Sequence, residues 1–428
     1  MTKKIGIILF LIFELQMLPA QWECPSKMGS FLKPFGNSDL LYASEITLSG
    51  GYIGSSPIYR AMAFVGLDYT KDNHSFYLEG GFKYWRRKDT IYEARDYVFD
   101  NYKLGFREAF YQNKSKIGNV TVGLSSSSLH DNYLLNERVL GLGYNHSFSA
   151  YKLSFIAGTV SQDFSREGTF CTTRYIYEVI QNRDRPTIGN ELWKSNLIGL
   201  TFSLLPNKLS VKKSETTGVS EDEFETFDEF EPAKEEKKPI INIDEFGIAL
   251  YNEFGSRIDS MPLIGGVYAN FDLFNGLLIK PEVLYQSAEN NNGVIVSLGI
   301  SKNILFGSSH KIQLGGDIVG FSSFDSAGKA LNSYSNLLVG EVLRIDVPEL
   351  PLYVAGIKYT VPKFKFHTKL QFAGYMHANT MSEIDLQIGK TFFKRIFVNA
   401  ILGYINSKQL ISGEDSALMG RVEIRVGI

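Results

Sequence analysis

Basic side chains alternate with apolar ones in the stretch "KFKFHTKLQF" near the C-terminus. Successive side chains of a β-strand point to opposite faces, so a strand here would carry cations on one face and apolar groups on the other. A row of cations attracts and orients anionic groups. The row consists of Lys363, Lys365, His367 and Lys369.

Two later segments alternate in the same way and add acidic groups to the polar face. "SEIDLQIG" carries Glu383 and Asp385, and the final "LMGRVEIRVGI" carries Arg421, Glu423 and Arg425. One interpretation is a transverse field across a wet interior, biased toward anions. The other is a salt-bridged wall that only keeps the interior hydrated, because cross-strand pairs of opposite charge contribute about 0.2–1 kcal/mol each.

The segment from Gln162 to Asn190 is the longest loop that we expect on the outer side. Loops of this length in a compact fold are usually functional. Folded inward, it would form a constriction whose guanidinium and aromatic groups suit carboxylates or sugars. The alternative is a solvated surface loop. The groups concerned are Arg166, Arg174, Tyr175, Tyr177, Arg183 and Arg185.

An acidic low-complexity insert covers residues 207–239. Its charge density predicts disorder in isolation, and its regular aromatic residues are typical of a segment that docks on a basic partner protein and folds as it binds. The alternative is a solvated tether. The residues that would contact a partner are Glu221, Asp222, Phe224, Phe227 and Phe230.

Catalytic, metal and nucleic-acid signatures are weak. The six histidines include no H-x-x-x-H pair, a spacing typical of zinc sites. Ser125 to Ser128 precede His130, which permits a hydrolase interpretation, but such neighbours are common by chance. The net charge of −2 argues against nucleic acid as a partner. We therefore expect no enzyme, metal or cofactor.

Alternation at period two recurs in segments of about ten residues along the chain, and no segment beyond residue 20 approaches 18 consecutive apolar residues. Nineteen candidate strands can be counted, and short turns alternate with long loops. That layout is typical of an all-β, transmembrane antiparallel up-and-down β-barrel, in which strand numbers are even. We expect about 18 strands, within a range of 16–20, and place the surplus candidate around residues 347–364.

The N-terminus predicts export. Lys3 and Lys4 precede an apolar run that ends before Glu14, and this run is too short to span a bilayer. We expect a signal peptide over 1–20 and one barrel domain over 21–428, located in the outer membrane of a Gram-negative bacterium. Cys24 and Cys171 can form one disulfide in an exported protein, and the sequence does not decide whether they do.

These features resemble the porin-like barrels of Gram-negative outer membranes. Residues 106–144 are loosely similar to a hairpin of the carbohydrate- or alginate-export porins, in which an Arg-Glu-Ala-aromatic run precedes a second strand and an acidic–arginine pair. The matching positions are Arg107, Glu108, Ala109, Tyr111, Glu137 and Arg138, whereas Gly123-Leu124-Ser125 replaces the usual Gly-Arg-Gln and Ile428 the customary terminal aromatic residue.

The expected barrel and the polar inner face of its strands together predict a channel for passive diffusion of small polar or anionic solutes, for example sugars or organic acids. The alternative is a non-conducting barrel subunit that sits in outer-membrane lipid and docks a periplasmic partner through the acidic insert. The sequence identifies neither the solute nor the oligomeric state.

Overall fold

The computed structural model describes residues 33–35, 39–54, 56–89, 97–129, 135–160, 196–206, 241–255, 263–273, 276–288, 291–306, 310–323, 352–375, 382–393, 395–406 and 416–428. Its strands are β1 (Lys33–Pro34), β2 (Leu40–Ile53), β3 (Ser56–Lys71), β4 (His74–Asp89), β5 (Tyr97–Ser115), β6 (Gly118–Leu129), β7 (Leu135–Ser147), β8 (Tyr151–Thr159), β9 (Asn196–Leu204), β10 (Ile241–Phe254), β11 (Leu263–Leu273), β12 (Leu277–Ala288), β13 (Asn291–Phe306), β14 (His310–Ser323), β15 (Leu352–Val361), β16 (Phe366–Tyr375), β17 (Ser382–Phe392), β18 (Ile396–Asn406) and β19 (Ser416–Gly427), with a short 3-10 helix η3 (Pro362–Phe364).

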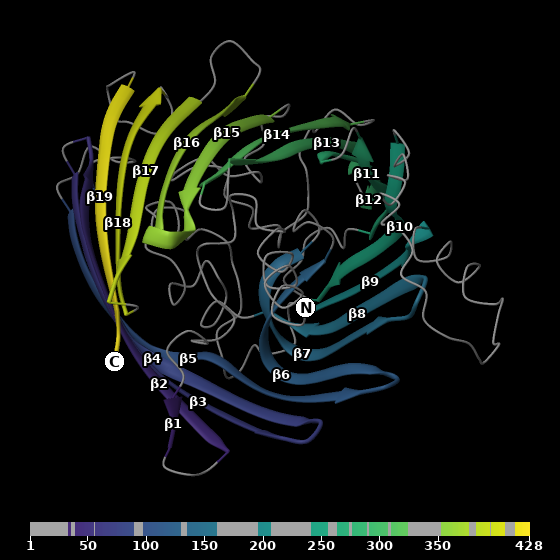
Figure 1. Cartoon of the computed structure of the whole chain (residues 1–428), viewed down its shortest axis with the longest axis horizontal. Helices are drawn as coiled ribbons and strands as arrows, with labels where there is room; N and C mark the ends of the chain where they lie inside the picture. Colours follow the sequence, from purple (N-terminus) through teal and green to yellow (C-terminus); the bar gives the residue numbers. More distant parts are fainter. Residues whose placement is uncertain are drawn as a thin grey trace, which may run out of the picture.

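Eighteen strands, β2 to β19, form a closed antiparallel barrel (Figure 1). Each strand pairs with the next, and β19 pairs with β2 from Met419 opposite Ile53 to Gly427 opposite Glu45. The short β1 pairs with the first residues of β2, beyond the end of β19. Closure removes the edges of the sheet, and the expected fold class and strand number are confirmed.

The surplus candidate strand is not where we expected it. Residues 352–361 form β15, and β15 pairs directly with β14. The nineteen candidate segments include one near Ser335, which falls outside the described residues, whereas β14 and β15 pair directly with each other. The prolines around residues 347–364 therefore bound a genuine strand. In the sequence, the serine-rich stretch from residue 125 also has the composition of a loop, but β6 continues through it to Leu129.

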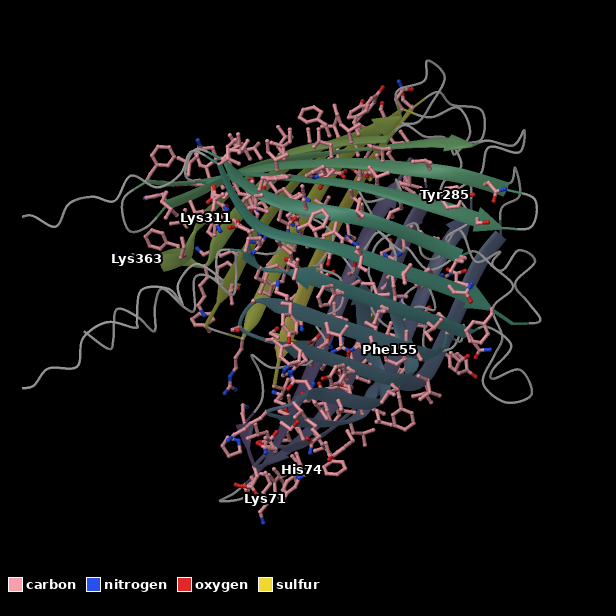
Figure 2. All side chains as sticks on the ribbon, turned by 90° about the vertical axis from the view of Figure 1, so that its right-hand side faces the viewer. Lys71, His74, Phe155, Tyr285, Lys311 and Lys363 are labelled. Carbon is pink, nitrogen blue, oxygen red and sulfur yellow. The ribbon has the colours of Figure 1, made fainter. Side chains whose placement is uncertain are left out.

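The two faces of the barrel differ in chemistry. Apolar side chains at alternate positions are exposed on the outside, as for Leu48, Val65 and Val296, whereas the intervening polar side chains are buried on the inside. In the last strand Val422, Ile424 and Ile428 face outward and Arg421 faces inward. Figure 2 shows the outer face side-on. An apolar outer surface on a closed barrel is the architecture of a chain that crosses a lipid bilayer through its strands.

The strands are joined by tight turns at one end of the barrel. Turns of two to four residues join β3 to β4, β5 to β6, β13 to β14 and β15 to β16 at this end, which we call the short-turn end. Figure 2 labels Lys71, His74, Lys311 and Lys363 along it. The acidic insert follows β9 and therefore begins and ends here. Helices long and apolar enough for a membrane crossing are absent from the described residues.

The β5–β6 ladder is shorter than its neighbours. It runs from Ser115 opposite Gly118 to Ala109 opposite Leu124, whereas β5 continues back to Tyr97 and pairs there with β4. Gly123 adopts a φ of 121°, and a Cβ at this position would overlap the carbonyl oxygen of Ala109. Beyond Gly123 the β6–β7 hairpin leaves β5 and bends inward, because Leu129 of β6 lies against Gly199 of β9.

Candidate functional site: the lumenal wall

A basic strip lies on the lumenal face of β14 to β16. Lys358 stands directly opposite Lys369 in the β15–β16 ladder, and Thr360 stands opposite His367. Lys311 of β14 is opposite Thr360. Since the outward neighbour Ile357 is exposed, the alternation directs Lys358 inward. Two like charges directly opposite each other are unfavourable on their own, and here two lysines are so placed, with Lys311 and His367 on the neighbouring positions of the strip.

The expected ladder of four cations is only half formed. Lys363 lies in η3, and Lys365 follows it with a left-handed φ of 48°. Both side chains are exposed at the turn, whereas His367 is buried on the strand. Pro362 lacks the N–H that a ladder needs, so the strand ends there. Residues 363–366 therefore alternate in sequence although they form a turn, and Lys363 and Lys365 do not lie on the lumenal wall.

The acidic and arginine residues of the last strands lie beside this strip. Glu383, Asp385 and Arg421 are buried on the inner face. One line of the register joins Lys369 to Gln387, Ile401 and Arg421 across four strands. Glu423 and Arg425 share the inward face of β19 with Arg421. The structure thus brings His367, Lys369, Glu383, Asp385, Arg421, Glu423 and Arg425 onto one continuous stretch of wall.

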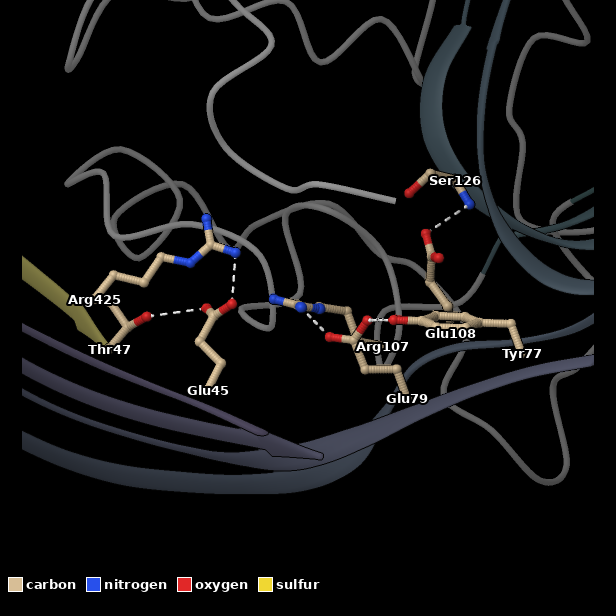
Figure 3. A network of polar contacts seen from close by, with 8 residues as sticks. All are labelled: Glu45, Thr47, Tyr77, Glu79, Arg107, Glu108, Ser126 and Arg425. Carbon is tan, nitrogen blue, oxygen red and sulfur yellow. Dashed lines mark hydrogen bonds and ion pairs between the residues drawn. The ribbon is translucent and has the colours of Figure 1, made fainter. Parts of the chain in front are cut away.

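The seam where β19 meets β2 carries an ion pair. Nη2 of Arg425 lies 2.5 Å from Oε2 of Glu45 (Figure 3). The hydroxyl of Thr47 donates to Oε1 of the same carboxylate at 3.2 Å. Glu45 is buried, and the Arg425 side chain remains 22% exposed. The side chains therefore reinforce the backbone ladder that closes the barrel.

A second, more deeply buried group lies on β3 to β5. Arg107 pairs with Glu79, and the hydroxyl of Tyr77 donates to Oε2 of Glu79 at 2.5 Å (Figure 3). The guanidinium carbon of Arg107 lies 4.1 Å from the centre of the Phe64 ring, a cation–π geometry. The Arg107 and Glu79 side chains are 3% and 0% exposed. The same Tyr-x-Glu contact recurs on β10, where Tyr251 donates to Glu253 at 2.8 Å.

Arg107 occupies a β-bulge. Glu79 is opposite Glu108, and the next pair joins Gly80 to Phe106, so Arg107 is the extra residue on β5. A bulge turns two consecutive side chains toward the same side, and Arg107 and Glu108 are both buried on the lumenal face. Oε1 of Glu108 accepts from the backbone N–H of Ser126 at 3.3 Å. This carboxylate therefore bridges β5 and β6 where their ladder has ended.

A second bulge lies on β10. The register shifts between Ile243 and Glu245, which makes Asp244 the extra residue. Glu245 accepts from Lys152 at 3.1 Å, from Ser203 at 2.6 Å and from Asn270 at 3.4 Å. In both bulges two adjacent charged residues interrupt an apolar alternation, in "FREAF" and "IDEF". That interruption is the sequence signal by which both clusters can be found.

An apolar cluster covers part of the lumenal face on β6 to β12. Its side chains point toward the lumen and are nevertheless buried, because they pack against one another. Leu129 brings the tip of the β6–β7 hairpin against them. Tyr251 and Tyr268 add two rings to it. The cluster comprises Leu129, Leu135, Val139, Ile156, Val160, Leu197, Ala249, Tyr251, Ile264, Tyr268 and Leu284. The lumen therefore has a charged sector and an apolar sector.

Several expected residues fall outside the described part of the chain. The constriction residues Arg166, Arg174, Tyr175, Tyr177, Arg183 and Arg185 do so, as do the insert residues Glu221, Asp222, Phe224, Phe227 and Phe230, and both Cys24 and Cys171. Ser125, Ser126 and Ser127 lie on β6, whereas His130 lies outside the described residues. Arg138 is fully buried and its backbone pairs with Ser126.

Comparison with solved structures finds the same fold in two bacterial outer-membrane proteins. The chain superimposes on OccK5 (OpdH) of Pseudomonas aeruginosa with a TM-score of 0.50 and 8% identity, covering 91% of this chain and 98% of that one. The superposition on OccAB1 of Acinetobacter baumannii has a TM-score of 0.51 and 11% identity, and it covers 95% of this chain and 99% of that one. No protein-family model matches the sequence, and no curated protein matches it. The resemblance to outer-membrane porin-like barrels is therefore confirmed at the level of the fold.

Proposed function

We propose that this protein is an outer-membrane channel through which small polar or anionic solutes diffuse passively. The observation that carries the proposal is the charged sector of the lumenal wall, where Lys358 faces Lys369 and Lys311 and His367 lie beside them. An 18-stranded barrel is wide enough for an aqueous passage unless other segments fill it. A charged inner face is stable only where water or counter-charges solvate it.

The charge pattern favours anions over neutral solutes. The basic strip on β14 to β16 adjoins Glu383 and Asp385 on β17, so cations and carboxylates form neighbouring sectors of one ring. A solute that carries a carboxylate meets the strip, and its hydroxyl groups can pair with the acidic sector. Organic acids and acidic sugars are therefore the proposed solutes, and the remaining candidate residues, Arg421, Glu423 and Arg425, line the same passage.

Conductance in a planar bilayer tests this proposal. Purified protein should give steady current steps, and the reversal potential in a salt gradient should indicate anion preference. The double variant Lys358→Gln/Lys369→Gln should lose most of that preference. The matched control Lys363→Gln/Lys365→Gln removes the same charge at the exposed turn and should change the anion preference little. Equal effects of the two double variants would contradict a selective strip on the wall.

The apolar sector favours a second candidate function, a non-conducting subunit. The β6–β7 hairpin bends into the lumen and packs Leu129 against β9, which narrows the passage. In this case the acidic insert at the short-turn end would dock a periplasmic protein. The wild-type protein would then give no current steps, and deletion of residues 221–231 would release a co-purifying partner without unfolding the barrel. A conducting wild-type protein excludes this candidate.

A further inference from the structure

Three polar side chains form a cluster on the outer face at the short-turn end. The hydroxyl of Tyr111 lies 2.6 Å from Nδ1 of His74, and the amide nitrogen of Asn113 lies 3.1 Å from the same atom. An amide nitrogen can only donate, so Nδ1 accepts. The ring proton therefore sits on Nε2, which is left to donate to a ligand. We call these three residues the His74 cluster.

An apolar groove of about 390 Å³ begins at this cluster and crosses the outer face of β2 to β6. The Tyr111 ring belongs to both features, because it lines the groove and packs 4.8 Å from the Phe76 ring. Leu40, Leu67 and Leu78 continue the lining, and Ala109 and Val122 close it beside the last pairs of the β5–β6 ladder. A groove on a face that meets bilayer lipid is filled by hydrocarbon chains.

Lysines surround the polar end of the groove. Lys71 stands opposite His74 in the β3–β4 ladder, and Lys116 lies in the neighbouring β5–β6 turn; both are exposed, and together they outnumber Asp72 of the β3–β4 turn. The backbone N–H of Lys114 donates to the carbonyl oxygen of Asn73 at 2.7 Å, which ties the two turns together. Figure 2 shows Lys71 and His74 at the same tip of the barrel. The local charge is positive, as an anionic headgroup requires.

We propose that the groove and the His74 cluster bind one anionic glycerophospholipid. An acyl chain fills the groove between Leu67, Leu78 and Val122, and Nε2–H of His74 donates to the headgroup phosphate while Lys71 and Lys116 supply charge. The amphipathic lining commits the site to a lipid, since a free phosphate makes no use of the apolar half. The proposal requires that the barrel stand in a bilayer and is independent of whether it conducts.

Native mass spectrometry of the full chain, released from mixed detergent–lipid micelles, tests the site. The probes are phosphatidylglycerol and, as the zwitterionic comparison, phosphatidylcholine. Wild-type protein should retain one phosphatidylglycerol at least about tenfold more often than one phosphatidylcholine. His74→Phe removes the donor at an exposed position and should abolish the difference. Ala109→Trp fills the groove and should reduce retention of both lipids.

Matched controls lie on the other side of the barrel. His310 makes the same contact with Tyr359, with Nδ1 2.7 Å from the hydroxyl, and neither residue lines the groove. His310→Phe and the outward-facing Ala355→Trp should retain lipid as the wild type does. Heat-modifiable migration on gels checks that each barrel is folded.

Three outcomes overturn the proposal. Wild-type protein without preference for phosphatidylglycerol excludes the headgroup site. Equal losses in the variants and their controls indicate general annular lipid. Displacement of the lipid by millimolar inorganic phosphate shows a bare anion site that does not need the groove. If Ala109→Trp does not fold, His74→Phe and its control still decide between these outcomes.

Discussion

The β19–β2 seam and the β5–β6 seam close the same wall in different ways. Nine register pairs join β19 to β2, and the Arg425–Glu45 pair adds a partly exposed contact. Seven pairs join β5 to β6, and beyond Ala109 the described residues of these strands share no ladder. There the carboxylate of Glu108 on β5 accepts from the backbone N–H of Ser126 on β6, and beside the gap the buried Arg107–Glu79 pair holds β5 to β4.

The comparison of the two seams shows where charged side chains are needed to hold the barrel wall together. A complete ladder satisfies the backbone by itself, so side chains at the β19–β2 seam can vary at little cost. An interrupted ladder leaves backbone groups that must find other partners, and Glu108, which the bulge at Arg107 turns inward, supplies one to the N–H of Ser126. We therefore expect equivalent substitutions to have much larger effects at the β5–β6 seam.

Arg107→Ala should be the most destabilising change. It leaves the fully buried Glu79 without its cation, and breaking a buried pair in this way costs about 3–5 kcal/mol. Denaturant unfolding of the refolded protein in detergent measures the loss. Arg107→Lys keeps the charge but not the planar contact with Phe64. It should therefore retain part of the stability that Arg107→Ala loses. A loss below about 1 kcal/mol for Arg107→Ala would show that water solvates this group.

Leu129→Ala should loosen the tip of the β6–β7 hairpin. It removes a buried side chain from the apolar cluster, and such truncations cost about 3 kcal/mol. If the hairpin narrows the lumen, the single-channel current should also rise. Val122→Ala is the matched control, because Val122 lies on the same strand with its side chain exposed outward. A current unchanged by Leu129→Ala would exclude the hairpin as the constriction.

Gly123→Ala should have a smaller effect on stability. A residue with a side chain is strained at a φ of 121°, at a cost of about 1–3 kcal/mol, and its Cβ would displace the Ala109 carbonyl. Because Gly123 lies one pair from the end of the β5–β6 ladder, amides near that end should exchange hydrogen faster in the variant. Gly143→Ala on β7 is a suitable control, since a Cβ there meets only Thr121 at 3.8 Å. Identical exchange rates in the two variants would contradict a special role for Gly123.

Sequence patterns predict the β19–β2 seam well and the β5–β6 seam poorly. Period-two alternation places Val422 and Arg421 on opposite faces because nothing interrupts the strand. The same pattern misplaces Lys363 and Lys365, since alternation does not report that the strand ends at Pro362. The contact of Leu129 with Gly199 joins residues far apart in sequence and has no local signal. The adjacent charges in "FREAF" mark the bulge but not the partner of Arg107.

Arg425→Gln should change stability least and thereby sharpens the comparison. The arginine is 22% exposed, and ion pairs in contact with water contribute about 0–1 kcal/mol. The nine backbone pairs remain, and Glu45 keeps the hydroxyl of Thr47. The same unfolding assay should therefore give a loss several times smaller than for Arg107→Ala. A comparable loss would mean that closure of the barrel depends on the Arg425 side chain as strongly as the wall beside the β5–β6 seam depends on Arg107. The distinction between the two seams would then fail.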